Sequence, residues 1–245
     1  MESVVVHDLT FRYWPEGPVV LDRASFQVAQ GEMLAVTGLS GCGKSTLCAC
    51  LNGIIPHSRD GEMTGSVLVN GKNTREYRVA SLALEVGLVF QDPDAQLFSP
   101  TVEDEIAFGP ENLCLPPEQI RERVDQVVAL LGIEALREAD PNRISGGEKH
   151  LVALAAVLAL DPPVLVLDEA LSGLDAGGRK TVTEVLTTLR RRGKTIIAVE
   201  HDLESVAVAD RMLVLEGGAI IRWDRTEAIL ADQDWLAARR LIYQR

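Results

Sequence analysis

Residues 33–46 read MLAVTGLSGCGKST, in which an apolar run leads into a glycine-rich turn. The run ends at Thr37, and the turn from Gly38 to Ser45 has the GxxxxGKS spacing of a phosphate-binding loop. In such a loop the glycines let backbone N–H groups curve around phosphate oxygens, and the N-terminus of the following helix adds positive potential. The stretch therefore predicts a buried strand, a nucleotide-binding turn and a helix, in that order.

The residue types within this loop predict separate tasks. Lys44 can reach the β- and γ-phosphates, and the Ser45 hydroxyl can ligate Mg²⁺. Cys42 occupies a variable position, so its side chain is expected to pack rather than to react. The residues expected to bind the nucleotide are Gly38, Ser40, Gly41, Cys42, Gly43, Lys44, Ser45 and Thr46.

The rest of the chain alternates β-prone apolar runs with helical spacing. Asn70-Gly71 is a hairpin-turn signal, and residues 118–131 have helical spacing ending at Gly132. Strand signals vanish between residues 92 and 160, which predicts a helical insert, and buried runs alternating with helices predict a mostly parallel sheet covered on both faces. The other predicted strands are 4–6, 26–28, 66–69, 86–90, 164–167, 195–199 and 211–215, with helices at 45–51, 151–160, 178–192 and 226–245.

These patterns predict an α/β fold with an N-terminal antiparallel β part and an inserted α-helical subdomain. We expect residues 1–91 and 161–225 to form the core with its β part, residues 92–160 to form the helical subdomain, and residues 226–245 to form a helical tail.

Composition excludes several function classes. The 245 residues carry 36 Asp and Glu against 24 Lys and Arg, a formal net charge of −12 that disfavours nucleic-acid binding. The longest apolar run, residues 151–160, is too short to span a bilayer. The residues after Met1 show neither the charged nor the apolar region of an export signal, and four cysteines are too few for a disulfide scaffold, so we expect reduced thiols.

Two acidic residues follow the apolar run 164–167. In an open α/β sheet the carboxyl ends of parallel strands face a common crevice, and we expect this strand to neighbour the one before the phosphate-binding loop. Asp168 would then hold Mg²⁺ through water, and Glu169 would polarise or deprotonate an attacking water. Without the phosphate-binding loop, the same pattern would be typical of a core strand leaving into solvent.

A third motif opens the apolar helix that follows residue 144. Ser145 is placed as an N-cap, and Glu148 lies three residues later, as in a capping box. A structural cap is one reading of the motif. The other is a second anion site, because a serine hydroxyl and the glycine amides of Gly146 and Gly147 at a helix start can bind a γ-phosphate.

The phosphate-binding loop, Ser145-Gly146-Gly147-Glu148 and Asp168-Glu169 occur in the order and spacing of an ABC-type ATPase, which the chain resembles over residues 3–222. The resemblance implies a P-loop NTPase with a RecA-like core, using ATP and Mg²⁺. It places Gln91 in the Q-loop, Asp175 in the D-loop and His201 at the switch position. Tyr13 is similar to the aromatic residue that stacks on adenine, although Trp14 and Phe11 could do the same.

The same resemblance assigns roles to the matched residues. Glu169, His201 and Gln91 would be catalytic, and Ser45, Gln91 and Asp168 would hold Mg²⁺. Because the signature helix lies in the inserted subdomain, the turn of Ser145, Gly146, Gly147 and Glu148 would close over the nucleotide of a second ATPase subunit. Two half-sites would thus be completed in a head-to-tail pair, either of identical chains or of related ones.

A narrower resemblance rests on residues 91–112, QDPDAQLFSPTVEDEIAFGPEN, which are similar to the ATPases of energy-coupling factor (ECF) transporters. These import vitamins and transition-metal ions such as cobalt or nickel. The likeness implies a peripheral position at the cytoplasmic face of the membrane, with a transmembrane scaffold subunit and a substrate-binding membrane subunit as partners. The stretch would receive a coupling helix of the scaffold, through Leu97, Phe98, Ile106 and Phe108 or those of them that are not needed for the subdomain core.

Three departures from the family pattern are present. In the signature, Glu148 stands where glutamine is commoner and Lys149-His150 stands where a basic residue and an arginine are expected. Glu200 precedes His201 where threonine is more usual. The region after Asp224 is short compared with many ECF ATPases, which leaves the mode of dimerisation open. The alternatives are an ATPase of another ABC transporter class, a non-transport ABC ATPase acting on DNA or ribosomes, and a metabolic kinase. A non-transport clamp would need a coiled-coil insert or a second cassette, and a kinase has no use for Ser145-Gly146-Gly147.

Overall fold

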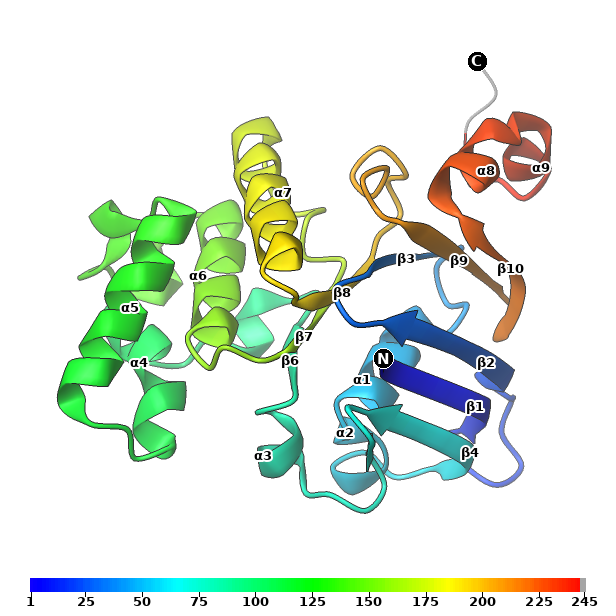
Figure 1. Ribbon diagram of the computed structural model, residues 1–245, viewed down its shortest axis with the longest axis horizontal. Helices are drawn as coiled ribbons and strands as arrows, with labels where there is room; N and C mark the ends of the chain where they lie inside the picture. The colour runs from blue at the N-terminus through cyan, green and yellow to red at the C-terminus, as the bar shows by residue number, and fades with distance from the viewer. Residues whose placement is uncertain (243–245) are drawn as a thin grey trace.

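A computed structural model describes residues 1–242 of the chain (Figure 1). Its N-terminal part is an antiparallel sheet, as predicted, with the strands in the order β2-β1-β4-β5. Asn70 and Gly71 both have positive φ, 48° and 79°, which is the backbone of a tight hairpin turn, and Val69 pairs with Lys72 across it. The strands are β1 (Glu2–Arg12), β2 (Leu21–Ala29), β4 (Glu62–Val69) and β5 (Lys72–Asn73).

The second sheet has six strands in the order β10-β9-β3-β8-β7-β6. Every neighbouring pair is parallel except β9 and β10, which confirms the mostly parallel sheet. The sequence predicts that the strand before the phosphate-binding loop, β3, and the strand that ends at Asp168, β7, are neighbours. This prediction is wrong, because β8 lies between them. The strands are β3 (Met33–Thr37), β6 (Val86–Val89), β7 (Val164–Asp168), β8 (Thr195–Val199), β9 (Arg211–Glu216) and β10 (Ala219–Arg225).

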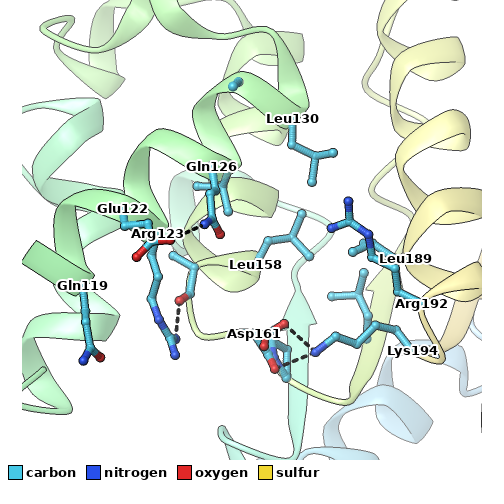
Figure 2. Close-up of a pocket in the computed structure, with 15 residues that line it drawn as sticks. Gln119, Glu122, Arg123, Gln126, Leu130, Leu158, Asp161, Leu189, Arg192 and Lys194 are labelled. Atoms are coloured by element: carbon cyan, nitrogen blue, oxygen red, sulfur yellow. Dashed lines mark hydrogen bonds and ion pairs between the residues drawn. The ribbon is translucent and has the colours of Figure 1, made fainter.

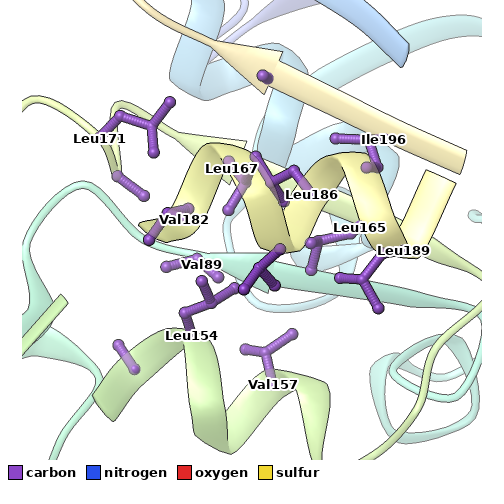
Figure 3. Close-up of a cluster of buried hydrophobic side chains, with 14 of the residues drawn as sticks. Val89, Leu154, Val157, Leu165, Leu167, Leu171, Val182, Leu186, Leu189 and Ile196 are labelled. Carbon is purple, nitrogen blue, oxygen red and sulfur yellow. The ribbon is translucent and has the colours of Figure 1, made fainter. Parts of the chain in front are cut away.

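Strands β3, β6, β7 and β8 are buried on both faces, as their uninterrupted apolar runs predict, whereas β10 is half-buried or exposed. Met33 and Ala35 of β3 pack on the helical side, whereas Leu34 and Val36 face the antiparallel sheet and the first helix. Figure 3 shows the helical side, where leucines and valines from two helices meet the strand residues Leu165 and Leu167. The phosphate-binding loop thus leaves a strand that is fixed from both sides.

The helices follow the sequence spacing closely. In α7, Val182, Leu186 and Leu189 recur at helical intervals and form its buried face. Gly132, with φ 67°, ends α5 as predicted. The helices are α1 (Lys44–Leu51), α2 (Ile54–His57), α3 (Val79–Leu82), α4 (Val102–Asn112), α5 (Pro117–Leu131), α6 (Gly146–Leu158), α7 (Ala176–Arg191), α8 (Thr226–Ala231) and α9 (Gln233–Ala238), with 3-10 turns at Pro93–Ala95, Glu134–Leu136 and Pro141–Arg143.

Helices α4, α5 and α6 occupy the segment in which strand signals vanish, and they lie to one side of the sheet (Figure 1). The division of the chain at residues 91 and 160 remains a prediction. Among residues 1–242, no helix combines the length and the apolar character that crossing a bilayer requires.

The tail differs from the prediction of one helix over residues 226–245. Helix α8 ends at Ala231, and Asp232 takes a non-helical ψ of 66° while its carboxylate accepts a hydrogen bond from the Trp235 N–H, which starts α9. An aspartate that bonds nearby backbone favours such a break over a continuous helix. Residues 243–245 of the predicted helix lie outside the described residues.

Candidate functional site

The phosphate-binding loop joins the end of β3 to the start of α1, and two of its glycines have no room for a side chain. Gly38 has φ 151°, and a Cβ there would lie 2.2 Å from the Leu215 carbonyl oxygen. Gly43 has φ 104°, and its Cβ would lie 2.6 Å from the Val20 carbonyl oxygen. Close backbone approach therefore requires glycine at both positions.

Lys44 is buried at the first position of α1. Its Nζ donates to the carbonyl oxygens of Gly38, at 2.9 Å, and Leu39, at 3.3 Å, and lies 3.6 Å from Glu169 Oε1. The ammonium group therefore lies against the loop, where the two carbonyl oxygens and the Glu169 carboxylate could be replaced as its partners by phosphate oxygens.

Ser45 and Asp168 meet although 123 residues and one intervening strand separate them. The Ser45 Oγ donates to Asp168 Oδ1 at 3.2 Å. Burial raises the pKa of the Asp168 carboxyl, while the Ser45 hydrogen bond opposes that shift. A hydroxyl and a carboxylate are hard oxygen donors, which suit Mg²⁺.

Three side chains converge on the buried carboxylate of Glu169. Gln91 Nε2 donates to its Oε2 at 2.7 Å, His201 Nε2 lies 2.6 Å from its Oε1, and Lys44 approaches the same oxygen. Glu169 has φ 53°, a conformation that a side chain rarely adopts and that is most often retained at functional positions. The sequence-predicted residues Lys44, Gln91, Glu169 and His201 are therefore brought together.

These residues line a cavity of about 530 Å³. The loops after β3, β6, β7 and β8 supply its walls, so it lies at the carboxyl ends of parallel strands, where α/β sheets bind ligands. The lining residues are Tyr13, Val20, Ser40, Gly41, Gly43, Lys44, Ser45, Thr46, Gln91, Glu169 and His201.

A larger cavity of about 890 Å³ lies elsewhere, between α5 and α7 (Figure 2). Arg123 and the Lys194–Asp161 ion pair stand at its wall, but no residue predicted from sequence to act on a nucleotide lines it. Another cavity, of about 910 Å³, is lined by Gly38, Leu39 and His201 together with residues of α9, so cavity size does not by itself point away from the phosphate-binding loop.

Among the three aromatic residues left open by the sequence, Tyr13 is the one at the cavity. Its hydroxyl lies 3.0 Å from Thr46 Oγ1, and its ring packs edge-on against Phe11, with ring centroids 4.9 Å apart. Phe11 is fully buried, and Trp14 is 57% exposed, without lining the cavity. The placement supports Tyr13 as the stacking residue, although stacking itself stays a prediction.

Cys42 is buried with its side chain in the apolar core beneath the loop. Burial is the main cause that raises the pKa of its thiol, so the thiolate is disfavoured. This arrangement agrees with the packing role expected for Cys42, and only its backbone remains available to a phosphate.

The signature turn forms the predicted capping box. The Ser145 N–H donates to Glu148 Oε2 at 2.7 Å, and the Glu148 N–H donates to Ser145 Oγ at 3.3 Å. Within residues 1–242, neither these residues nor Gly146 and Gly147 line the 530 Å³ cavity, and Ser145 and Gly146 are exposed. The structural reading of the motif is confirmed, and the anion-binding reading stays a prediction.

Asp175 caps α7, since its Oδ1 accepts the Gly178 N–H at 2.7 Å. It is exposed and lies outside the cavity lining, so its D-loop role also stays a prediction.

The stretch predicted to meet a scaffold subunit presents an aromatic pair. Phe98 and Phe108 are 64% and 45% exposed and pack edge to face, with ring centroids 4.7 Å apart. Leu97 is half-buried against the core, and Ile106 is fully buried within it, which removes Ile106 from the expected surface. In α4 the Ile106 side chain belongs to the face that packs inward.

Glu200, which in the sequence stands out only as a departure from the family pattern, is 1% exposed and lies beside the site. Its Oε1 accepts the Leu171 N–H at 2.8 Å. Burial, followed by the charges of Glu169, Asp202 and Asp168, raises its pKa to about 7, while the hydrogen bond opposes the shift. Its position directly before His201 was the only available signal.

We expect Glu200→Gln to remove a pH dependence of stability. A folded-state pKa of about 7, raised from 4.5, favours the protonated group in the folded state. Its stabilising effect is therefore complete below pH 4.5 and is lost as pH rises through 7. The change amounts to about 3 kcal/mol at most, at 1.36 kcal/mol per pKa unit.

Denaturant unfolding of both proteins at pH 5.5 and 8 checks this expectation. Glutamine keeps an oxygen for the Leu171 N–H but does not titrate. Between pH 5.5 and pH 8 the free energy of unfolding of the parent should fall relative to that of the variant. An equal change in the free energy of unfolding of the two proteins would contradict the expectation.

Comparison with known proteins gives consistent results. The profile of a family described as "ABC transporter" matches residues 21–172. A relative from Pyrococcus abyssi, named as an ABC transporter ATP-binding protein, is 42% identical over 238 residues, covering 96% of this chain and 85% of that protein. The cobalt import ATP-binding protein CbiO of Syntrophus aciditrophicus is 40% identical over 239 residues, covering 97% of this chain and 84% of that protein. The solved structure of cbiO1 from Clostridium perfringens, described as part of the ABC transporter complex cbiONQ, matches with a TM-score of 0.83 and 33% identity, covering 97% of this chain and 95% of that one.

Proposed function

The chain belongs to the ABC transporter family and is an ATPase of that family, and from this premise we propose that it energises a membrane importer of the ECF type, for a vitamin or a transition-metal ion. The observation that carries the hydrolytic part is the convergence of Lys44, Gln91 and His201 on Glu169. The ECF part is supported by the likeness to a cobalt import protein and to a member of the cbiONQ complex.

In the proposed reaction the triphosphate lies in the loop, and Lys44 turns from the Gly38 carbonyl to the phosphates. Glu169, released from that lysine, orients a water molecule and accepts its proton as the oxygen attacks the γ-phosphorus. The bond to the bridging oxygen breaks, and ADP and phosphate leave. His201 and Gln91 hold the carboxylate and the γ-phosphate in line.

The oxygen donors beside the loop fit Mg²⁺. Ser45 and Asp168, the latter through water, would hold the ion together with Gln91. The ion supplies charge neutralisation at the phosphate oxygens. The Ser45–Asp168 distance of 3.2 Å brings a hydroxyl and a carboxylate oxygen to one place, as such a site needs.

The exposed signature turn supports a head-to-tail pair of ATPase subunits. Ser145 and the glycine amides after it lie outside their own chain's cavity and would close over the partner's γ-phosphate. Loss of that phosphate after hydrolysis would let the pair open. The partner is either a second copy or a related chain, and mass measurement of the assembled complex distinguishes them.

The aromatic pair Phe98 and Phe108 supports a peripheral position at the cytoplasmic face of the membrane. Two exposed rings in contact form an apolar anchor of the kind that dominates interfaces. We assign to it a helix of the transmembrane scaffold subunit, and the selectivity for the imported nutrient to a separate substrate-binding membrane subunit.

Co-expression with the scaffold and substrate-binding subunits of an ECF-type system tests the proposal. The chain should co-purify with the scaffold, and vesicles holding the complex should take up labelled cobalt, nickel or a vitamin only with ATP present on the side of this chain. The ECF assignment would be contradicted if the chain failed to associate with such subunits but bound the membrane domain of another ABC class stably. The assignment as an ABC-family ATPase would be unaffected by that result.

Replacing Phe98 and Phe108 together with serine is expected to weaken scaffold binding by about 10- to 100-fold, as loss of a buried aromatic anchor does. ATP binding should be unchanged, because neither ring lines the nucleotide cavity. The measurement is the scaffold affinity of the purified ATPase. Tyr77→Ser is the matched control, since Tyr77 is also an exposed aromatic residue, 41% exposed, in a different part of the chain. Equal losses in both variants would remove the aromatic pair from the interface.

A further inference from the structure

His150 lies in the second turn of α6, is 9% exposed and has no role in the reaction described above. Its Nδ1 lies 2.8 Å from the Gly146 carbonyl oxygen, and its Nε2 lies 3.3 Å from the Gln91 carbonyl oxygen. A carbonyl oxygen only accepts, so which of the two contacts is a hydrogen bond depends on which ring nitrogen carries the proton, and the other is a polar contact. One imidazole therefore joins the first turn of the signature helix to the backbone of the loop that carries Gln91.

A third segment lies against the same ring. A Cβ built on Gly173 would lie 2.3 Å from His150 Cε1 and 2.7 Å from Nδ1, so the ring occupies the space that a side chain would need. Gly173 belongs to the loop between Glu169 and Asp175. The three segments that the family resemblance assigns to nucleotide contact thus share one buried side chain.

The connection extends to the catalytic carboxylate. The side-chain amide of Gln91 donates to Glu169 Oε2 at 2.7 Å, while its backbone carbonyl faces His150. The signature turn and Glu169 are therefore linked through two residues, His150 and Gln91. In a head-to-tail pair, the signature turn and Glu169 of one chain contact different nucleotides.

We propose that His150 is a positioning residue that couples the two nucleotide sites of the paired ATPase. Closure of the signature turn on one γ-phosphate displaces the Gly146 carbonyl, and His150 transmits the displacement to Gln91 and so to Glu169 at the other nucleotide. By linkage the effect on binding is reciprocal, so each bound ATP favours the other. The inference rests on the proposed head-to-tail pair.

Two near-isosteric variants separate the contacts. His150→Asn places an amide N–H near the Nδ1 position, toward Gly146, and removes the polar atom that faces Gln91. His150→Gln places an amide N–H near the Nε2 position, toward Gln91, and removes the polar atom that faces Gly146. Each variant therefore removes one of the two His150 contacts while its side chain fills most of the space of the imidazole ring. The matched control is His57→Gln, because His57 Nε2 also lies 2.9 Å from a carbonyl oxygen, that of Thr74, outside the cavity lining.

The readout is ATP hydrolysis by the assembled ATPase against ATP concentration, analysed as kcat, KM and the Hill coefficient. The parent and His57→Gln should give a Hill coefficient above 1. Both His150 variants should bring it close to 1, with KM changed less than about threefold, since half-site contacts to the nucleotide are intact. A parent coefficient of 1, or an unchanged coefficient in both His150 variants, would overturn the proposal.

Gly173→Ala provides a second route if the His150 variants do not fold. Its added methyl group pushes the ring from its place while leaving the imidazole itself in the sequence, and it should also lower the Hill coefficient. Pair formation is measured separately, by light scattering of the ATP-bound Glu169→Gln protein. Failure to pair would contradict the proposed function, whereas pairing and hydrolysis that are indifferent to His150 and Gly173 would contradict this inference alone.

Discussion

Glu169→Gln is expected to lower the rate of ATP hydrolysis by about 10²- to 10⁴-fold, the range that loss of a positioned general base produces. Glutamine fills the same space and can still accept from Gln91 Nε2, so the nucleotide site keeps its shape. It cannot take a proton from water. ATP should therefore bind and remain intact, and the head-to-tail pair should accumulate.

Two measurements on the same protein check this result. Steady-state phosphate release gives the loss in kcat, and light scattering with Mg²⁺ and ATP gives the mass of the trapped species. Glu85→Gln serves as the matched control, since Glu85 is another carboxylate paired with a lysine, Lys72, in a different part of the fold. A Glu169→Gln protein that binds ATP but stays monomeric would contradict the head-to-tail pair. A variant that hydrolyses ATP at the parental rate would contradict the role of Glu169 as general base.

Lys44→Ala is expected to weaken ATP binding by about 100-fold or more, because removal of one member of a buried, hydrogen-bonded charge pair costs about 2–5 kcal/mol. In the free protein Lys44 bonds the Gly38 carbonyl and approaches Glu169, and the phosphates would replace both partners. Hydrolysis should fall with binding. The fold should survive, since Gln91 and His201 still accompany the Glu169 carboxylate.

Calorimetric titration with ATP measures the affinity, and circular dichroism confirms that the variant is folded. Lys72→Ala is the control, because Lys72 pairs with Glu85 away from the cavity. Unchanged ATPase activity in Lys44→Ala would remove this lysine from the mechanism.

Much of the fold is predictable because it depends on short-range patterns. The apolar run before Gly38 becomes a strand buried on both faces, and Asn70-Gly71 becomes a tight hairpin turn. Ser145 and Glu148 form their capping box because both partners lie within one helical turn. Backbone propensity and local hydrogen bonding decide such features within a few residues.

Other features were missed because they depend on distant parts of the chain. The sequence left open which of the apolar residues near Phe98 pack the subdomain core, and only the packing of α4 places Ile106 there. The tail was expected as one helix, and the Asp232 cap divides it. Glu200 and His150 stand in the sequence only as departures from the family pattern, and their contacts with Leu171 and Gln91 exist only once separate loops meet.

A phosphate-binding turn between a buried strand and a helix, two acids at the end of another strand, and a capped serine-glycine turn can all be read from the order of residues. That β8 separates β3 from β7, and that Lys44, Gln91 and His201 nevertheless meet at Glu169, follows from the three-dimensional arrangement. The reason is physical: helix and strand periodicity act over a few residues, whereas the meeting of side chains depends on strand order and on crossovers that local periodicity does not encode.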